Sequence, residues 1–150
     1  MSEKERAVEL FREGYNCSQS VFTAFAHRFN IDEETAKKIS AGLGGGLGRM
    51  REVCGAVSGA AMVIGSICSA TDGKDSENKQ KNYELVREFA DRFTKINGSI
   101  ICRELLGLDV KMEDTAKPDS RTAEYYKKRP CVELVGDAAE ILAEIIKENE

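Results

Sequence analysis

Four of the five cysteines lie where the sequence predicts the start of a helix: Cys17, Cys54, Cys102 and Cys131. The first turn of a helix has unpaired amide N–H groups and carries the positive end of the helix dipole. Both features stabilise a thiolate, which is the nucleophilic and metal-binding form of cysteine. The placement of these four residues therefore predicts thiol chemistry.

Cys68 is predicted to differ from the other four cysteines. It lies near the C-terminal end of an apolar helix expected at about residues 51–69, where the dipole disfavours a thiolate. On a straight helix Cys54 and Cys68 would be about 21 Å apart, whereas a disulfide needs Cα atoms within about 7 Å. We expect Cys68 to be an ordinary buried residue.

The spacing of the four cysteines excludes the common short motifs. They are separated by 37, 48 and 29 residues and include no Cys-x-x-Cys pair, so neither a zinc ribbon nor a thioredoxin motif is present. Each cysteine alone is well explained by burial in a core. Four in similar positions favour a shared site, because a compact helical bundle can gather several helix starts at one end.

Composition limits the classes of function. The 150 residues suit a single domain over 1–150, with 41% hydrophobic and 32% charged residues, as in helix-rich globular proteins. A net charge of −4 argues against nucleic-acid binding, since no broad basic surface is available for phosphates. The charged start of the chain is unlike a secretion signal. We therefore expect a cytoplasmic protein, where an odd set of cysteines favours chemistry or metal binding over structural disulfides.

Apolar residues recur at helical spacing, and no segment shows the two-residue alternation of a strand. The predicted helices cover about residues 3–13, 16–29, 32–42, 51–69, 76–97, 99–107 and 130–145. The fold expected is an all-α bundle of about six to seven helices around a central buried Gly/Ala-rich helix, with a surface loop at 108–122. The helix at 76–97 is a candidate homodimer interface. The uncharged stretch 53–70 is long enough to span a membrane, but its glycines and serines favour a buried helix instead, and no membrane association is expected.

Glycines are concentrated beside Cys54. Residues 42–48 include five glycines in seven positions, so this segment must bend sharply or let another backbone approach closely. Gly55 and Gly59 lie four apart and remove bulk from one helix face, which suits a neighbouring helix or a small cofactor. The glycines expected to leave room and amide donors around such a cofactor are Gly44, Gly45, Gly46, Gly55 and Gly59.

The chain resembles the redox-active protein family named for a C…GCAxxG…C…C cysteine pattern. The matching segments are 14–19 (GYNCSQ), 54–59 (CGAVSG) after the glycine run, 102–107 (CRELLG) and Cys131. The central motif has Cys-Gly-Ala where the family name has Gly-Cys-Ala. The resemblance covers about residues 5–145 and implies that Cys17, Cys54, Cys102 and Cys131 are the functional cysteines, with Cys68 outside the pattern.

Two hypotheses follow for these four cysteines. The first is thiol–disulfide exchange or electron transfer with an unknown redox partner protein, which would make the chain a thiol–disulfide oxidoreductase. In it, Arg103 would favour ionisation of Cys102, while Arg49 and Arg51 would favour that of Cys54. The alternative is that three or four thiolates of the same set bind an iron–sulfur cluster or zinc without thiol exchange.

Two further features of the sequence give weaker evidence about function. The glycine run with Arg49 and Arg51 could cradle an anion or nucleotide, but it fits neither G-x-G-x-x-G nor the P-loop motif, so a packing role is preferred. His27 is the single histidine, which excludes any site that needs two histidines from one chain.

Overall fold

The computed structural model describes residues 1–69, 71–107 and 115–150, and this part of the chain is all-α. It contains eight α-helices: α1 (Glu3–Arg12), α2 (Cys17–Ala24), α3 (Glu33–Ser40), α4 (Gly55–Cys68), α5 (Ser76–Asn97), α6 (Cys102–Leu105), α7 (Ala123–Lys128) and α8 (Cys131–Glu148). Two short 3₁₀ turns, η1 (Ala26–Arg28) and η2 (Ala41–Leu43), follow α2 and α3. Within these residues no strand forms, and the predicted fold class is confirmed.

Side-chain caps fix the start of most helices. Ser2 and Asn16 each form a capping box, with Glu5 and Gln19 respectively, which satisfies two otherwise unpaired amides at α1 and at α2. Asp32, Asp75 and Thr122 cap α3, α5 and α7 in the simpler way, by accepting one amide hydrogen bond. The ends of these elements are thus encoded locally in the sequence.

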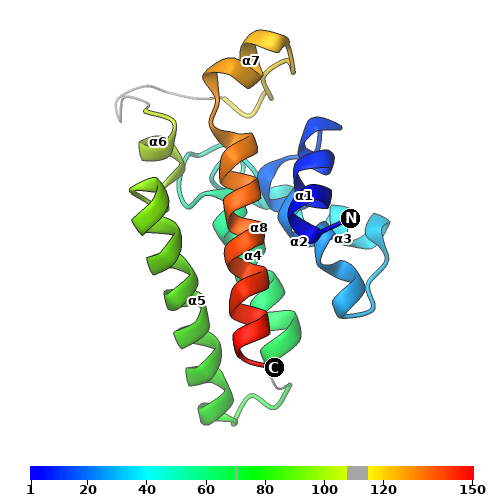
Figure 1. Cartoon of the computed structure of the whole chain (residues 1–150), viewed down its shortest axis with the longest axis vertical. Helices are drawn as coiled ribbons and strands as arrows, with labels where there is room; N and C mark the ends of the chain where they lie inside the picture. Colours follow the sequence, from blue (N-terminus) through cyan, green and yellow to red (C-terminus); the bar gives the residue numbers. More distant parts are fainter. Residues whose placement is uncertain (70, 108–114) are drawn as a thin grey trace.

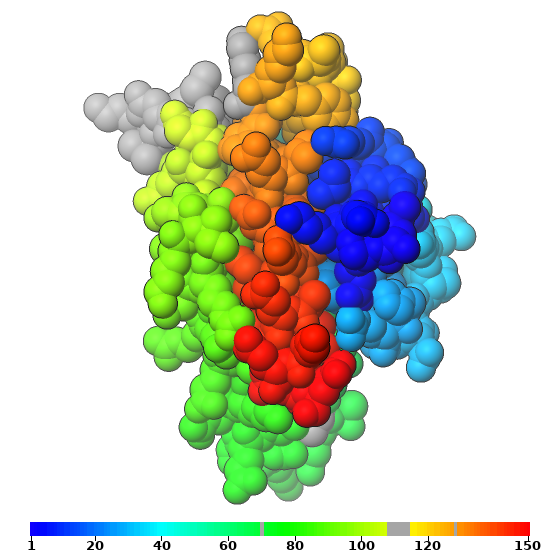
Figure 2. Space-filling model, viewed as in Figure 1, coloured from blue at the N-terminus to red at the C-terminus, as the bar shows by residue number. Residues whose placement is uncertain are grey.

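α8 is the central element of the bundle. It packs against α1, α2, α4 and α5, and Figure 1 shows it running between α5 on one side and α1 and α2 on the other. Its buried face includes Val135, Ala138, Leu142 and Ile145, a spacing that places apolar side chains on one side of a helix. In the space-filling view the opposite face of α8 is open to the surface over most of its length (Figure 2).

α2 and α4 approach each other closely because α4 has glycines on the facing surface. A Cβ added at Gly59 would lie 2.9 Å from the Ser18 carbonyl oxygen, and one at Gly55 would lie 3.0 Å from the Ser18 amide nitrogen. Ser18 is fully buried, and its hydroxyl donates to the Ser40 carbonyl oxygen at 2.7 Å. The two glycines therefore let the start of α2 lie directly on α4.

Some boundaries and faces differ from the predictions. α4 begins at Gly55 rather than near residue 51, because the backbone of residues 51–54 is hydrogen-bonded to that of 100–103 and is not helical. The short helix after α5 begins at Cys102, and Ser99 does not cap its first residue. α7 was not predicted at all; it lies just beyond the loop expected at 108–122, of which 108–114 fall outside the described residues and 115–120 are exposed and non-helical.

No helix in the described part of the chain combines the length and the apolar character that a membrane crossing requires. α4, which contains most of the uncharged stretch, has only 14 residues.

The contact between α2 and α4 gives a stability test within one helix. Gly59→Ala should lower the free energy of unfolding by about 1–3 kcal/mol, because the added methyl group would meet backbone of α2. Gly65→Ala is the matched control in α4: its Cβ would have no neighbour closer than 3.6 Å. That change should raise stability by up to about 1 kcal/mol, through helix propensity alone. Urea unfolding followed by circular dichroism measures both, and an equal effect of the two changes would contradict the packing role.

Candidate functional site

The four predicted cysteines come together. A cavity of about 320 Å³ is lined by Cys17, Cys54, Cys102 and Cys131. It lies at the end of the bundle where α6, α7 and the start of α8 gather (Figure 1). Cys17, Cys102 and Cys131 are the first residues of α2, α6 and α8, and Cys54 directly precedes α4. The prediction that helix starts would collect these cysteines at one end is borne out by this geometry.

A short antiparallel pairing brings Cys54 next to Cys102. An isolated β-bridge joins Val53 to Ile101. On either side of it the Cys54 amide donates to the Ile100 carbonyl at 2.8 Å, and the Cys102 amide donates to the Glu52 carbonyl at 2.6 Å. These bonds hold together two segments about fifty residues apart in the chain. They thereby fix the backbone positions of Cys54 and Cys102, whose own amides make the bonds.

The glycine run forms a left-handed turn over the cavity. Its backbone has positive φ at Gly45, Gly46 and Gly48, and also at three residues with side chains, Leu47, Arg49 and Arg51. Left-handed backbone costs roughly 1 kcal/mol or more at each non-glycine residue. Hydrogen bonds across the turn offset that cost: the amides of residues 47 to 52 each donate to a carbonyl within 42–47. The amides of this half of the turn are therefore used internally rather than directed at an anion.

Gly44 and Gly46 are needed for close approach. A Cβ at Gly46 would lie 2.7 Å from the Cβ of Cys102, and one at Gly44 would lie 2.3 Å from the Asn16 side-chain nitrogen. Asn16 is the cap of α2 and donates to the Ala41 carbonyl at 2.9 Å. The turn thus rests on the residues that position Cys17 and Cys102.

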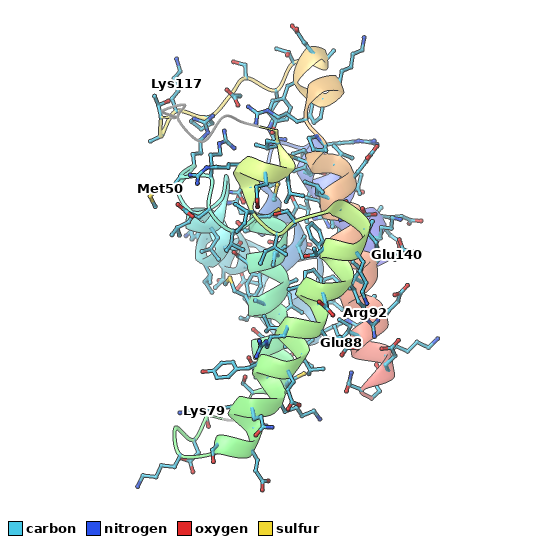
Figure 3. All side chains as sticks on the ribbon, turned by 90° about the vertical axis from the view of Figure 1, so that its left-hand side faces the viewer. Met50, Lys79, Glu88, Arg92, Lys117 and Glu140 are labelled. Atoms are coloured by element: carbon cyan, nitrogen blue, oxygen red, sulfur yellow. The ribbon has the colours of Figure 1, made fainter. Side chains whose placement is uncertain are left out.

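A second segment, residues 115–129, closes the other side of the cavity. Ala116, Pro118, Asp119, Arg121, Tyr125 and Arg129 all line it. Arg49 holds this segment against the glycine turn by donating to the carbonyls of Thr115 and Lys117 and pairing with Asp119 at 3.2 Å. In Figure 3, Lys117 and Met50 lie near each other at this end of the molecule.

Cys17 and Cys131 both line the cavity, and each shifts the ionisation of the other. The hydrogen bond from Cys17, helped by Arg129, Arg121 and Arg51, lowers the pKa of Cys131 to about 7 despite its burial. The same hydrogen bond and burial raise the pKa of Cys17 well above its ordinary value. Since the two groups titrate together, the pair loses its first proton near neutral pH and the charge resides mainly on Cys131.

At Cys54 and Cys102, burial affects the pKa more than the nearby hydrogen-bond donors do. At Cys54 the amides of Ala56 and Val57 stabilise the thiolate, but burial outweighs them and raises its pKa to about 12. Burial also raises the pKa of Cys102, although the Arg51 guanidinium lies 3.7 Å from its Sγ. Position at a helix start therefore does not by itself make a reactive cysteine in this protein.

The arginines act differently from the prediction. Arg103 was expected to favour ionisation of Cys102, but its guanidinium lies toward the Met50 carbonyl and Glu52, and Arg51 contacts Cys102 instead. Arg51 is 7% exposed, which is unusual for an arginine. Arg121 and Arg129 were missed, because in the sequence they belong to a polar loop and to a basic run that is typical of a solvated surface.

Three of the four helix starts at the cavity lack a side-chain cap, while the fourth, that of α2, is capped by Asn16. No side chain caps α4, α6 or α8, whose starts carry Cys54, Cys102 and Cys131. The helices that begin elsewhere in the described residues, α1, α3, α5 and α7, all have side-chain caps. The N-terminal amides of α4 and α8, two helices of more than three turns, therefore add positive potential beside the thiols.

The remaining predicted residues fall in two groups. Gly44, Gly45, Gly46 and Gly55 line the cavity, whereas Gly59 lies one turn further along α4 against Ser18. Cys68 lies at the other end of α4 and is half-buried, and His27 is on the exposed side of η1. All five cysteines are free thiols. Among the described residues, no three His, Cys, Asp or Glu side chains are grouped so that they could hold a metal ion.

The fold and the site define an all-α protein in which four of the five cysteines line one cavity. The chain belongs to the family described as "Putative redox-active protein (C_GCAxxG_C_C)", whose model matches residues 15–145. The transposed Cys54-Gly55 order does not remove the chain from this family. Comparison with curated proteins and with solved structures gave no match in either case.

The pKa of Cys131 can be measured directly. Its rate of alkylation by iodoacetamide, followed by mass spectrometry, should rise with pH through a midpoint near 7, because only the thiolate reacts. Cys17→Ala removes the main stabilising hydrogen bond, so the midpoint should move up toward the ordinary value of about 8.5. Cys68→Ala should leave it unchanged. A midpoint near 8.5 in the unaltered protein would show that Cys131 is not activated.

Proposed function

We propose that this protein is a thiol–disulfide oxidoreductase in which Cys131 and Cys17 interconvert between a dithiol and a disulfide. The observation that carries the proposal is that these two thiols line the same cavity and shift each other's ionisation, which leaves the pKa of Cys131 lowered to about 7. Thiols that share a cavity and titrate together can act on one substrate disulfide in turn, whereas thiols placed only for core packing need not interact.

The roles of the two residues follow from their protonation. The Cys131 thiolate attacks one sulfur of a substrate disulfide, and the other substrate sulfur leaves as a thiolate. Cys17 then loses its proton and attacks Cys131 Sγ, which releases the second substrate thiol and leaves a Cys17–Cys131 disulfide. Two electrons pass from the protein to the substrate, and the reverse sequence reduces the protein.

Cys54 and Cys102 have a different place in the proposal. Their raised pKa values keep them protonated at neutral pH, so they are poor nucleophiles there. They line the same cavity and lie close enough to influence the ionisation of Cys131 and Cys17. We assign the first attack on the substrate to Cys131. Cys54 and Cys102 would take part only in later thiol–disulfide exchange within the protein.

The metal-binding alternative has less support. It requires three or four ionised sulfurs around a common centre, whereas the described residues offer no such group and two of the four thiols resist ionisation. Elemental analysis and a visible spectrum of protein purified without oxygen distinguish the two. A stoichiometric metal, or the absorption of an iron–sulfur cluster, would favour the alternative.

Controlled oxidation tests the proposal. The reduced protein, treated with one equivalent of a mild disulfide oxidant, alkylated and digested, should show Cys17 linked to Cys131 as the dominant product. Cys131→Ser should slow loss of the remaining thiols by about tenfold or more at pH 7, because the thiolate with the lowest pKa is gone. Cys68→Ser is the matched control and should behave like the unaltered protein. A dominant pairing that omits Cys131, or no disulfide at all, would overturn the proposed function.

A further inference from the structure

Three of the four thiols of the site are buried, and Cys17 is half-buried. Cys54, Cys102 and Cys131 have 3%, 7% and 9% of their surface exposed. The lining residues that are exposed are at the cavity edge, in the glycine turn at Gly42 and Gly48 and in the facing segment at Pro118. The opening thus lies between these two segments, and the reactive sulfurs lie behind it. A disulfide on the surface of a folded protein would have to enter this opening to be attacked.

The volume of the cavity suits a small molecule. At about 320 Å³ it lies at the lower end of the range in which proteins bind compact ligands. Its wall combines apolar surface from Phe11, Leu105, Leu106 and Leu134 with polar groups. This combination of an enclosed shape and a few convergent polar groups is typical of a ligand site.

The described lining of the cavity is rich in arginine although the chain as a whole is acidic. Four arginines line it, Arg49, Arg51, Arg121 and Arg129, against one carboxylate, Asp119. Asp119 is shared between Arg49 at 3.2 Å and Arg129 at 2.9 Å. The uncapped starts of α4 and α8 add to the same potential. Positive charge gathered in a low-dielectric hollow attracts anions far more strongly than surface charge does.

Arg121 is the arginine best placed to recognise a ligand. It is held by the carbonyls of Phe11 at 2.8 Å and Tyr15 at 3.0 Å, and its guanidinium lies 4.2 Å from the centre of the Phe11 ring. Among the described residues its hydrogen bonds thus go to neutral oxygens, and they orient the group without neutralising it. Tyr125 lies beside it, and burial raises the pKa of that phenol to about 12, so its hydroxyl remains a donor.

We propose that the substrate of this site is a small disulfide that carries carboxylate groups, bound through Arg121 and Arg129 with its sulfurs at Cys131. The inference rests on the proposed function and names its substrate class. The reaction consumes one substrate disulfide and the Cys131 and Cys17 thiols, and yields two substrate thiols and one protein disulfide. No other oxidant is required, and the redox partner protein expected from the sequence is not needed for this step.

Three small disulfides that differ in charge test the inference. Dithiodiglycolate is anionic, 2-hydroxyethyl disulfide is neutral and cystamine is cationic. Each is mixed with the reduced protein at pH 7, and formation of the Cys17–Cys131 disulfide is timed by acid quenching and mass spectrometry. A charge-assisted contact predicts a rate about tenfold higher for the anionic than for the neutral reagent, and the lowest rate for the cationic one. The ratio of two rates on one protein cancels any change in the reactivity of Cys131 itself.

Substitution of single arginines shows which of them produces the preference for an anionic disulfide. Arg121→Gln and Arg129→Gln should each lower the anionic-to-neutral rate ratio several-fold, and Arg121→Lys should retain part of it. Arg92→Gln is the matched control, since Arg92 lies on α5 beside Glu88 and pairs with Glu148, outside the cavity lining (Figure 3). Its ratio should equal that of the unaltered protein. If Arg121→Gln fails to fold, the Arg129 variant alone still tests the inference.

The outcomes separate this inference from the proposed function. If the disulfide forms equally fast with all three reagents, or fastest with cystamine, the anionic substrate class is wrong while thiol exchange stands. If it forms with none of them, the proposed function itself fails. Oxidised DsbA, a protein with a strongly oxidising disulfide, tests access, and we expect it to react at least a hundredfold more slowly than dithiodiglycolate. A comparable rate would overturn the restriction to small substrates.

Discussion

The site depends on the close contact between the start of α2 and the first two turns of α4. Gly55 and Gly59 allow it, because any side chain at either position would meet the backbone of Ser18. The buried Ser18 hydroxyl then ties the same point to the end of α3. α8 packs on both helices, so the separation of α2 from α4 determines how near Cys17 lies to Cys131. A wider contact would leave four isolated cysteines in place of one cavity.

Within that cavity, reactivity is set by competition between burial and donors. All four thiols are near helix starts, and burial opposes ionisation of each. Two amide donors at Cys54 do not overcome this opposition, and neither does one guanidinium at Cys102. Cys131 differs because a neighbouring thiol donates to it and three arginines act on it together. In a low dielectric, several charged or polar groups together can stabilise a thiolate by more than its desolvation costs. A single donor does not offset that cost.

Local sequence predicted the parts of the structure that local interactions control. The starts of α2, α3 and α5 and the end of α5 are encoded within a few residues, by the caps at Asn16, Asp32 and Asp75 and by Gly98. These boundaries agree with the predicted ones to within one residue. The true start of α4 was missed because it depends on the pairing of its preceding residues with a distant segment. α7 was missed although its cap, Thr122, is local, because the helix has only six residues. In α5 the apolar spacing of Tyr83, Phe89, Phe93 and Ile96 predicts one buried face, and this prediction is partly wrong. Phe89 and Phe93 are buried, but Tyr83 and Ile96 are more than 60% exposed. The apolar pattern of a helix predicts which face is buried. The elements that pack against the helix determine how much of that face is buried along its length.

The same distinction explains why the cysteines were predictable and their arginines were not. A helix start can be recognised around each cysteine, so the gathering of four such starts follows once the helices form a bundle. Arg121 and Arg129 belong to a segment that Arg49, on the left-handed glycine turn, holds over the cavity. The carbonyls of Phe11 and Tyr15, far away in the sequence, position Arg121. The acidic net charge gives no hint of this, because net charge sums the whole surface while a cavity responds to the few groups that line it. The strained backbone at Arg49 and Arg51 therefore has a use: it aims one guanidinium at the covering segment and the other at Cys102.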